Sequence, residues 1–486
     1  MKRKFKVLSV VLVMALFITS NASISVVGAS EIENKESINN GVKIESFYPS
    51  YTNSAAITNN GDLYCWGLNT DGEVGNGTRD TQQLPVKILD NVKKFLWNDD
   101  TAAAIKENGD LYCWGDNYYG EVGKGNYYDQ LTPIKILNNV KEVFESAAIT
   151  INGELYCWGN NTFGQVGNGP NYSHQPTPVK ILDNVRNFST NGETSFAITI
   201  NGELYGWGRN NCGEVGNGNT SDQSTPVKIL DNVKEFSISY ATSAVITMDG
   251  ELYCWGNNSC GQVGNGSTSD RLTPVKILDN VKDFFSDGET SSAIMENGEL
   301  YCWGRNDCGE VGNGNTRDQS TPVKILDNVK KICIDNETTR AVMTNGELYC
   351  WGYNNYGQVG NGNDNYMQLT PVKILDNVKE IYVFNRTTGA ITTNGNLYCW
   401  GDNSYGQVGN GNDNYEQLIP VKILDNVKEF SIDGETASAI TINENLYCWG
   451  KNYYGRVGNG TYNDQLTPYK VIFPKDTSID SSVTLK

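Results

Sequence analysis

The sequence predicts an all-β protein, a β-propeller built from nine four-stranded repeats of about 48 residues each. Trp-Gly pairs mark the repeats at Trp66, Trp114, Trp158, Trp207, Trp255, Trp303, Trp351, Trp400 and Trp449. Neighbouring tryptophans are 48, 44, 49, 48, 48, 48, 49 and 49 residues apart, a period typical of stacked units that cannot bury their apolar faces alone. No helical period is sustained anywhere in the chain.

Each repeat contains four β-rich segments separated by turn signals. In residues 281–328 these segments are Val-Lys-Asp-Phe, Ser-Ser-Ala-Ile-Met, Leu-Tyr-Cys-Trp and Thr-Pro-Val-Lys-Ile-Leu. The Asn297-Gly298 pair between the second and third segments predicts a hairpin with a type I′ turn, in which both central residues need positive φ. Neither face of Leu-Tyr-Cys-Trp is charged, so we expect this strand to be buried on both sides.

The repeat resembles that of the regulator-of-chromosome-condensation propeller family. Asn-Gly-Glu-Leu-Tyr-Cys-Trp-Gly, then Asn, Gly-Gln-Val-Gly-Asn-Gly and Thr-Pro-Val, follow the family signature Asp-Gly-x-x-Trp-x-Trp-Gly-x-Asn and Gly-Gln-Leu-Gly-x-Gly. The match covers about residues 42–474. The resemblance implies a propeller, usually of seven blades.

Nine repeats favour a single ring of nine blades, while seven blades with two extra units, or an open spiral, are the alternatives. A closed ring requires the chain ends to meet, because an open one leaves an unpaired sheet edge. If the blades begin at Ser54, residues 44–48 would complete the last blade beside residues 467–473.

Residues 1–29 have the features of a signal peptide: a cationic start, an apolar run over residues 7–18, and small residues at Val27-Gly28-Ala29. An uncleaved membrane anchor is the alternative. We expect a secreted protein with a flexible lead-in at residues 30–41, the propeller at 42–474 and a C-terminal tail at 475–486, with no membrane contact after cleavage.

The chain is acidic, with a formal net charge of −18. Loss of the four cationic leader residues leaves 34 Lys plus Arg against 56 Asp plus Glu, a net charge of about −22. Such a charge repels phosphate backbones, which argues against nucleic acid as a partner. It favours a cationic protein surface as partner or, alternatively, simple solubility in the extracellular medium.

Eight of the twelve cysteines occupy one position before Trp, where the fourth repeat carries Gly206. A position that accepts Cys or Gly indicates a small buried filler, and bridges such as Cys254 to Cys260 are the alternative. His174 is the only histidine, so no Cys/His metal set can be assembled, and no calcium-loop spacing occurs. We expect no metal and no cofactor.

The segment that varies most between repeats joins the first and second strands, and divergent loops on a rigid scaffold are typical of binding surfaces. In the family, the equivalent loops line one face of the disk and resemble a contact surface for protein partners. The predicted partner-binding residues are Tyr48, Tyr51, Trp97, Asp99, Asp100, Glu145, Glu193, Tyr240, Phe285, Asp287, Glu289, Asp335, Glu337, Phe384, Arg386, Asp433 and Glu435. Ordinary solvated turns are the alternative interpretation.

A second candidate surface is the loop after Gly-Asn-Gly, which is rich in Tyr, Asn and Asp and so suited to adaptable contacts. It comprises residues 79–83, 126–130, 171–175, 363–368, 412–417 and 462–465.

Catalysis finds no support, because nearly identical repeats do not supply one asymmetric set of nucleophile, base and acid. We therefore expect a secreted, monomeric, non-enzymatic propeller that binds another protein through one face. It looks most like the exported bacterial members of the family. Guanine-nucleotide exchange on a small GTPase and carbohydrate or cell-wall binding are the alternatives.

Overall fold

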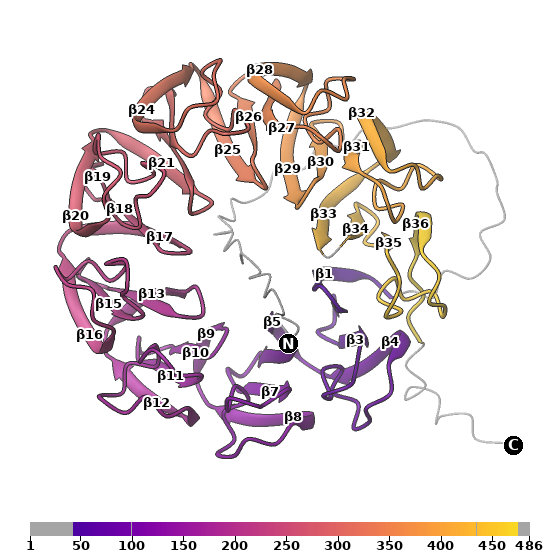
Figure 1. The fold of residues 1–486 in the computed structure, drawn as a ribbon. Helices are drawn as coiled ribbons and strands as arrows, with labels where there is room; N and C mark the ends of the chain where they lie inside the picture. Colours follow the sequence, from indigo (N-terminus) through magenta and orange to yellow (C-terminus); the bar gives the residue numbers. More distant parts are fainter. Residues whose placement is uncertain (1–41, 99, 434, 475–486) are drawn as a thin grey trace, which may run out of the picture.

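The computed structural model describes residues 42–98, 100–433 and 435–474. These residues form nine antiparallel four-stranded sheets arranged as one closed ring, which confirms the predicted nine-bladed propeller over the alternatives (Figure 1). Every regular element among them is a strand, and none is a helix that could cross a membrane. The predicted leader, lead-in and C-terminal tail lie outside the described residues.

Each blade consists of four consecutive strands, and we number the blades 1 to 9 along the chain. The first strands lie nearest the ring axis in Figure 1: β1 (Ile44–Pro49), β5 (Val92–Asn98), β9 (Val140–Phe144), β13 (Val185–Thr190), β17 (Val233–Ser239), β21 (Val281–Ser286), β25 (Val329–Asp335), β29 (Val378–Phe384) and β33 (Val427–Asp433). The second strands are β2 (Asn53–Thr58), β6 (Thr101–Lys106), β10 (Ala147–Thr150), β14 (Thr194–Thr199), β18 (Thr242–Thr247), β22 (Thr290–Met295), β26 (Thr338–Met343), β30 (Thr387–Thr392) and β34 (Thr436–Thr441).

The third strands, which carry the Trp-Gly pairs, are β3 (Leu63–Gly67), β7 (Leu111–Gly115), β11 (Leu155–Gly159), β15 (Leu204–Gly208), β19 (Leu252–Gly256), β23 (Leu300–Gly304), β27 (Leu348–Tyr353), β31 (Leu397–Asp402) and β35 (Leu446–Gly450). The outermost strands are β4 (Gln82–Leu89), β8 (Gln130–Leu137), β12 (Gln175–Leu182), β16 (Gln223–Leu230), β20 (Arg271–Leu278), β24 (Gln319–Leu326), β28 (Met367–Leu375), β32 (Glu416–Leu424) and β36 (Gln465–Lys470).

The predicted hairpin between the second and third strands is present, but its predicted turn type is wrong. Gly298 N donates to Met295 O at 2.8 Å, and Met295 N donates to Glu299 O at 2.9 Å, so three residues form the loop. Only Gly298 has positive φ, at 82°. A three-residue loop needs a left-handed residue at its last position alone, whereas a two-residue type I′ turn needs two.

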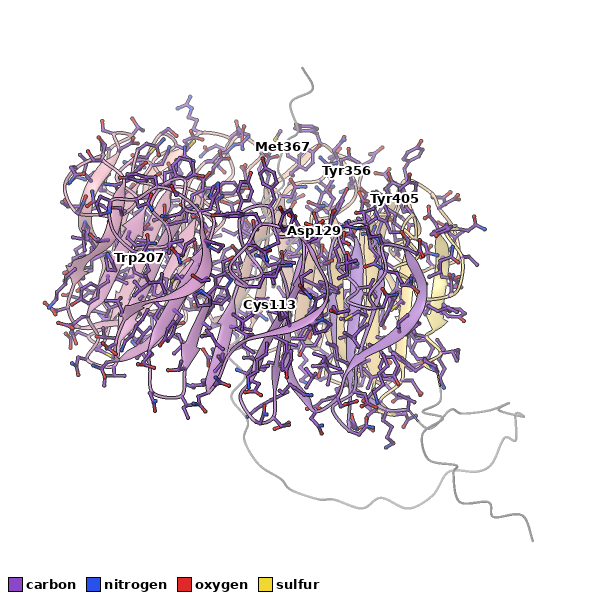
Figure 2. All side chains as sticks on the ribbon, turned by 90° about the horizontal axis from the view of Figure 1, so that it is seen from below. Cys113, Asp129, Trp207, Tyr356, Met367 and Tyr405 are labelled. Carbon is purple, nitrogen blue, oxygen red and sulfur yellow. The ribbon has the colours of Figure 1, made fainter. Side chains whose placement is uncertain are left out.

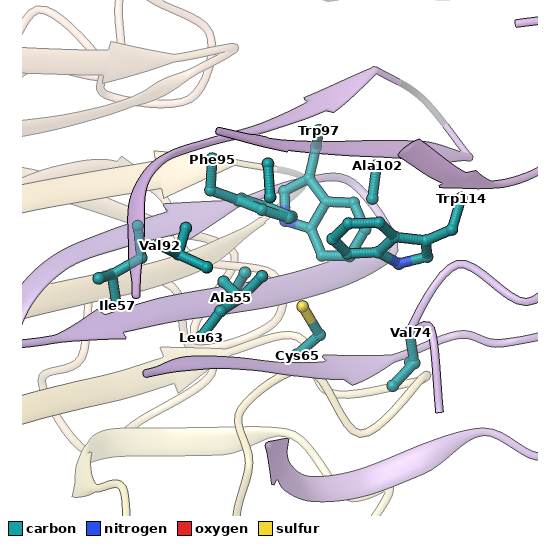
Figure 3. Packing of buried hydrophobic residues seen from close by; sticks show 11 residues of the cluster. Ala55, Ile57, Leu63, Cys65, Val74, Val92, Phe95, Trp97, Ala102 and Trp114 are labelled. Carbon is teal, nitrogen blue, oxygen red and sulfur yellow. The ribbon is translucent and has the colours of Figure 1, made fainter. Parts of the chain in front are cut away.

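The tryptophans hold neighbouring blades together, and all nine in the Trp-Gly pairs are at most 2% exposed. Each indole Nε1 donates to a backbone carbonyl in the Gly-x-Val-Gly segment of the preceding blade, at 2.6 to 3.1 Å. Figure 3 shows Trp114 of blade 2 packed with Phe95 and Ala102 opposite Val74 and Cys65 of blade 1. The third strand is therefore buried on both sides, as predicted.

The seam between blade 9 and blade 1 repeats the contacts of every other blade pair. Trp66 Nε1 donates to Arg456 O at 2.8 Å, and Gly460 N donates to Gln83 O at 3.1 Å. Phe473 packs edge-on against the rings of Tyr64 and Trp66, at 5.2 and 6.0 Å between centroids. The ring thus closes by side-chain packing and loop contacts between whole blades.

The expected sharing of one blade by the two chain ends is wrong. Ile44–Pro49 pairs with Asn53–Thr58 in blade 1, and Gln465–Lys470 pairs with Leu446–Gly450 in blade 9. Because each blade is complete in itself, no strand is left for the other end to supply.

Gly206, the one departure from Cys before Trp, makes room for a large neighbour. Phe196 lies directly opposite Gly206 on β14, where blade 1 has Ala55 opposite Cys65. A Cβ on Gly206 would lie 2.6 Å from Phe196 Cε1. All twelve cysteines are unpaired, and the eight before Trp are buried fillers as expected.

This pairing predicts a compensating double substitution. We expect Gly206→Cys alone to destabilise the protein by about 1 to 3 kcal/mol through overpacking, and Phe196→Ala alone by about 3 to 5 kcal/mol through the cavity it leaves. The double variant recreates the Ala-Cys pair of blade 1. Its loss in free energy of unfolding should therefore be smaller than the sum of the losses in the two single variants. Chemical unfolding of the four proteins measures the coupling, and strictly additive losses would contradict the assignment.

Candidate functional site

The connections of each blade alternate between the two faces of the disk, because its strands form an antiparallel meander. One face, the loop face, carries the turns between first and second strands and the long loops between third and fourth strands. The other, the turn face, carries the three-residue hairpins and the connections to the next blade. Both surfaces that the sequence singles out therefore lie on the loop face. Figure 2 views the disk edge-on, with Tyr356, Met367 and Tyr405 towards one face and Trp207 within the thickness of the disk.

Each long loop is fixed by one buried asparagine that follows the Trp-Gly pair at the second position. Asn69, which is fully buried, accepts a hydrogen bond from Val74 N at 2.9 Å and donates to Thr78 O and Asp80 O. The same bond to the valine of Gly-x-Val-Gly occurs in all nine blades. The loop face is therefore a rigid scaffold whose outward side chains are free to differ.

Every strongly exposed tyrosine lies on the loop face. These residues are Tyr51, Tyr118, Tyr127, Tyr128, Tyr172, Tyr240, Tyr366, Tyr415, Tyr453 and Tyr462, with exposed fractions from 47% to 81%. All but Tyr240 belong to blades 7, 8, 9, 1, 2 and 3, which are consecutive around the closed ring. We call these nine residues the tyrosine crescent. The turn face instead exposes Ile151, Ile200, Met248 and Ile442.

The predicted partner-binding residues that the structure describes all lie on the loop face, with unequal accessibility. Tyr51, Tyr240 and Glu289 are exposed, and Asp99 lies outside the described residues. Twelve others are partly buried: Tyr48, Asp100, Glu145, Glu193, Phe285, Asp287, Asp335, Glu337, Phe384, Arg386, Asp433 and Glu435.

Trp97 is the predicted residue that offers least to a partner. Its side chain is 7% exposed, its Nε1 donates to Tyr48 O at 3.0 Å, and its ring packs edge-on against Phe95 at 4.8 Å. Trp97 thus ties the first turn of blade 2 to that of blade 1. Asp287 has a similar local role, because its Oδ1 accepts from Glu289 N at 3.0 Å and Thr290 N at 2.7 Å.

Three predicted acids are paired with cations of their own blade. Arg305 Nη1 lies 2.5 Å from Glu289 Oε2, Arg209 pairs with Glu193, and Lys451 pairs with Glu435. These bridges join the turn between the first two strands to the start of the long loop. They also reduce the charge that the turns present to solvent.

A pocket of about 200 Å³ brings together Phe384, Arg386 and Glu435, three of the predicted residues, with Gln407. It lies on the loop face at blades 7 to 9. The Arg386 guanidinium lies 4.1 Å from the ring centroid of Tyr356, while Arg386 Nε is buried and has no hydrogen-bond partner within the described residues. The pocket is thus suited to a partner group that accepts a hydrogen bond.

The long loops were ranked below the first turns, although six of the ten strongly exposed tyrosines lie in this second candidate surface. Tyr118 and Tyr453, at the same position of their long loops, were outside both candidate sets. Alignment of the nine long loops carries the missing signal, since tyrosines recur there in five of the nine repeats.

Comparison with protein-family models matches residues 28–338 to the RCC1-like domain. Residues 345–383, 394–432 and 443–484 match the Regulator of chromosome condensation (RCC1) repeat. Comparison with curated proteins found no match.

Solved structures with a similar fold include human WBSCR16, at 22% identity and TM-score 0.48, covering 66% of this chain and 94% of that chain. Yeast RCC1 (Prp20), solved bound to Kap60, is 21% identical with TM-score 0.48, covering 66% of this chain and 84% of that chain. Prp20p from Saccharomyces cerevisiae is 20% identical with TM-score 0.48, covering 69% of this chain and 91% of that chain.

A buried carboxyl beneath the loop face gives the propeller a pH-dependent stability. Glu73 is fully buried in the Gly-x-Val-Gly segment, and its Oε2 accepts from Asp71 N at 2.8 Å. Burial raises the pKa of Glu73 from 4.5 to about 7. Other blades carry Gln at this position, and Gln262 Oε1 accepts the equivalent bond from Cys260 N at 2.9 Å.

We expect Glu73→Gln to stabilise the protein at pH 8 and to change little at pH 4. Between the unfolded pKa near 4.5 and the folded pKa near 7, only the folded state keeps the proton, so the wild type loses stability as pH rises through this window. The loss is complete above the folded pKa and amounts to about 3 kcal/mol, which the amide variant avoids. Urea unfolding from pH 4 to 8 measures it. Gln262→Glu is the matched control and should lose stability at pH 8, whereas a pH-independent effect of Glu73→Gln would contradict the account.

Proposed function

Because the chain belongs to the family of RCC1-like repeat propellers, we propose that it is a secreted, non-enzymatic module that binds another protein through its loop face. The observation that carries this proposal is the concentration of exposed tyrosines on that face. Tyrosine supplies large contact area at low conformational cost, and it is enriched in binding surfaces and in their energetic hot spots.

The continuity of the tyrosine crescent supports one extended contact surface. Nine tyrosines follow six consecutive blades, and the seam between blades 9 and 1 lies within this arc. Since the buried asparagines and the indole hydrogen bonds hold the long loops in place, little conformational entropy is lost when a partner binds. A rigid surface of this kind suits recognition of a folded protein.

The charge of the crescent indicates the chemistry of the partner. Asp364 and Asp413 are exposed in the same loops as Tyr366 and Tyr415, and neither makes an ion pair within the described part of the chain. With an acidic net charge of −18 for the whole chain, the crescent favours a partner surface rich in Lys and Arg. The pocket beside Arg386 would then accept one hydrogen-bond acceptor at the edge of this contact.

Secretion and the exported bacterial type of the family rest on the leader predicted at residues 1–29. The choice of protein over nucleic acid follows from the same acidic charge. Exchange activity on a GTPase and glycan binding through repeated Tyr and Asn are the competing functions, and the experiment below separates them.

The test compares two surface variants of the chain. One replaces Tyr128, Tyr415 and Tyr453 of the crescent by Ala, and the other replaces Ile151, Ile200 and Ile442 of the turn face by Ala. A partner captured from culture medium by the wild type is identified, and its affinity for each variant is measured by surface plasmon resonance. We expect the crescent variant to bind at least roughly 30-fold more weakly, since truncation of hot-spot tyrosines costs about 1 to 2 kcal/mol each.

The turn-face variant should bind as the wild type does. Its three isoleucines are also exposed, but they lie on the opposite face of the disk. Equal binding of all three proteins, or loss in the turn-face variant alone, would overturn the choice of face. Accelerated nucleotide release from a GTPase, or retention on cell-wall glycan without a protein partner, would overturn the proposed function itself.

A further inference from the structure

A compact group of ligand-type side chains lies on the loop face where blade 6 meets blade 7, beside Tyr366 of the tyrosine crescent. It consists of Asp307, Cys308 and Glu310 from the long loop of blade 6 and Glu337 from the first turn of blade 7, and we call it the Cys308 cluster. One thiol and three carboxylates place one ligand atom each within 4.8 Å of all the others. The Cys308 Sγ lies 3.5 Å from Glu337 Oε2.

The cluster contains a buried polar atom without a partner. Glu310 is fully buried, and its Oε2 accepts from Cys308 N at 2.9 Å, whereas its Oε1 has no hydrogen-bond partner within the described residues. A buried carboxylate oxygen beside further acids is costly unless a proton or a cation compensates it.

Arg305 does not supply that compensation. Its guanidinium contacts both Asp307 oxygens at 2.8 and 2.9 Å, Glu289 at 2.5 Å and Glu337 Oε1 at 3.0 Å, and none of these bonds goes to Glu310. Glu337 Oε2 accepts from the Cys308 thiol, and each carboxylate oxygen keeps a second lone pair. Arg305 thus orients the acids as outer-shell residues orient metal ligands.

Equivalent positions in other blades lack this combination. The position of Cys308 carries Phe163, Tyr356 or Tyr405 elsewhere, and a cation of the following blade stacks on each ring: Arg209, Arg386 and Lys451 respectively. Cys212 and Cys260 share the thiol, but Asn211 and Ser259 replace the acid before it. Among the described residues, only the thiol of blade 6 meets three carboxylates, one of which, Glu337, comes from the neighbouring blade.

We propose that the Cys308 cluster binds one Zn²⁺ ion. Zn²⁺ takes four ligands in a tetrahedron at about 2.0 to 2.3 Å from S and O atoms, which sets neighbouring ligand atoms roughly 3.5 Å apart. The four groups lie close enough to reach this geometry by side-chain rotation. The thiol sulfur binds as thiolate, so its proton passes to solvent as the Zn–S bond forms. Oxygen-preferring Ca²⁺ and Mg²⁺ do not use such a thiol.

The site differs from the sequence-based expectation of no metal, which considered only Cys/His sets and calcium loops. Three carboxylates take the place of the absent histidines, and they come from two blades. Binding would therefore join blades 6 and 7 across their loop face. The site borders the crescent, because Tyr366 lies beside Cys308.

The test titrates the reduced, metal-free chain with Cd²⁺, a spectroscopic analogue of Zn²⁺, and follows the ultraviolet charge-transfer band of the thiolate-cadmium bond. We expect an end point at one equivalent and displacement of Cd²⁺ by Zn²⁺. Cys308→Ser should abolish the band, and Glu310→Gln should weaken binding at least roughly tenfold, as loss of a charged ligand does. Gln occupies this position in four other blades, so the variant should fold.

Cys212→Ser and Cys260→Ser are the matched controls, because both thiols occupy the position of Cys308 without its full set of acids: Asn211 and Ser259 stand in the place of Asp307. Neither should change the stoichiometry or the affinity. Absence of a band at one equivalent, an unchanged band in Cys308→Ser, or equal loss in the control variants would overturn the proposal. Unchanged Zn²⁺ affinity in Glu310→Gln, with folding verified by unfolding curves, would remove Glu310 from the site.

Discussion

The structure depends on one interaction repeated nine times, the hydrogen bond from a buried indole to a backbone carbonyl of the preceding blade. The bond does two things that packing alone does not. It satisfies the only polar atom of a large side chain in an apolar interface, and it fixes the height and rotation of one blade against the next. The neighbouring glycine is part of the same contact. A Cβ on Gly216 would lie 2.6 Å from Trp255 Nε1, so only glycine lets the loop approach the ring this closely.

Because the carbonyl acceptor belongs to the long loop, this bond also connects the interior of the ring to its loop face. The loop leaves the third strand, is held by its buried asparagine, accepts the indole of the next blade and then contacts that blade's outer strand. The backbone of the long loop is therefore held in place by these contacts, whereas its fold does not depend on most of its outward side chains. This division explains how nearly identical repeats can present tyrosines over six blades and thiols over three without any change in fold.

Much of the fold could be predicted from the sequence, because the periodic tryptophans, glycines and hairpin signals act locally and repeat in register. Which strand begins each blade could not be predicted, because a cyclic repeat has no marked beginning. Residues 44–48 could belong to the first blade or to the last. The Trp97 indole was expected on the surface, but its contact with Tyr48 of the neighbouring blade depends on blade packing that no single repeat reveals. Arg340 was also unforeseen. It is fully buried where other blades have small or aromatic residues, and it donates to Thr388 Oγ1 of the next blade at 2.8 Å.

The site was predicted in part for the same reason. The variable turns identified in the sequence lie on the loop face, but residues that combine only across a blade boundary, such as Glu337 with Cys308, have no local signature. The central claim is that one ring closes through the same indole bond as every other blade pair, and hydrogen exchange tests it most directly. In protein labelled with ¹⁵N at tryptophan indoles, with Trp66→Phe used to assign its signal, the account predicts that the Trp66 indole N–H exchanges as slowly as those of the other blade tryptophans. Rapid exchange of Trp66 while the others stay protected would contradict a closed ring.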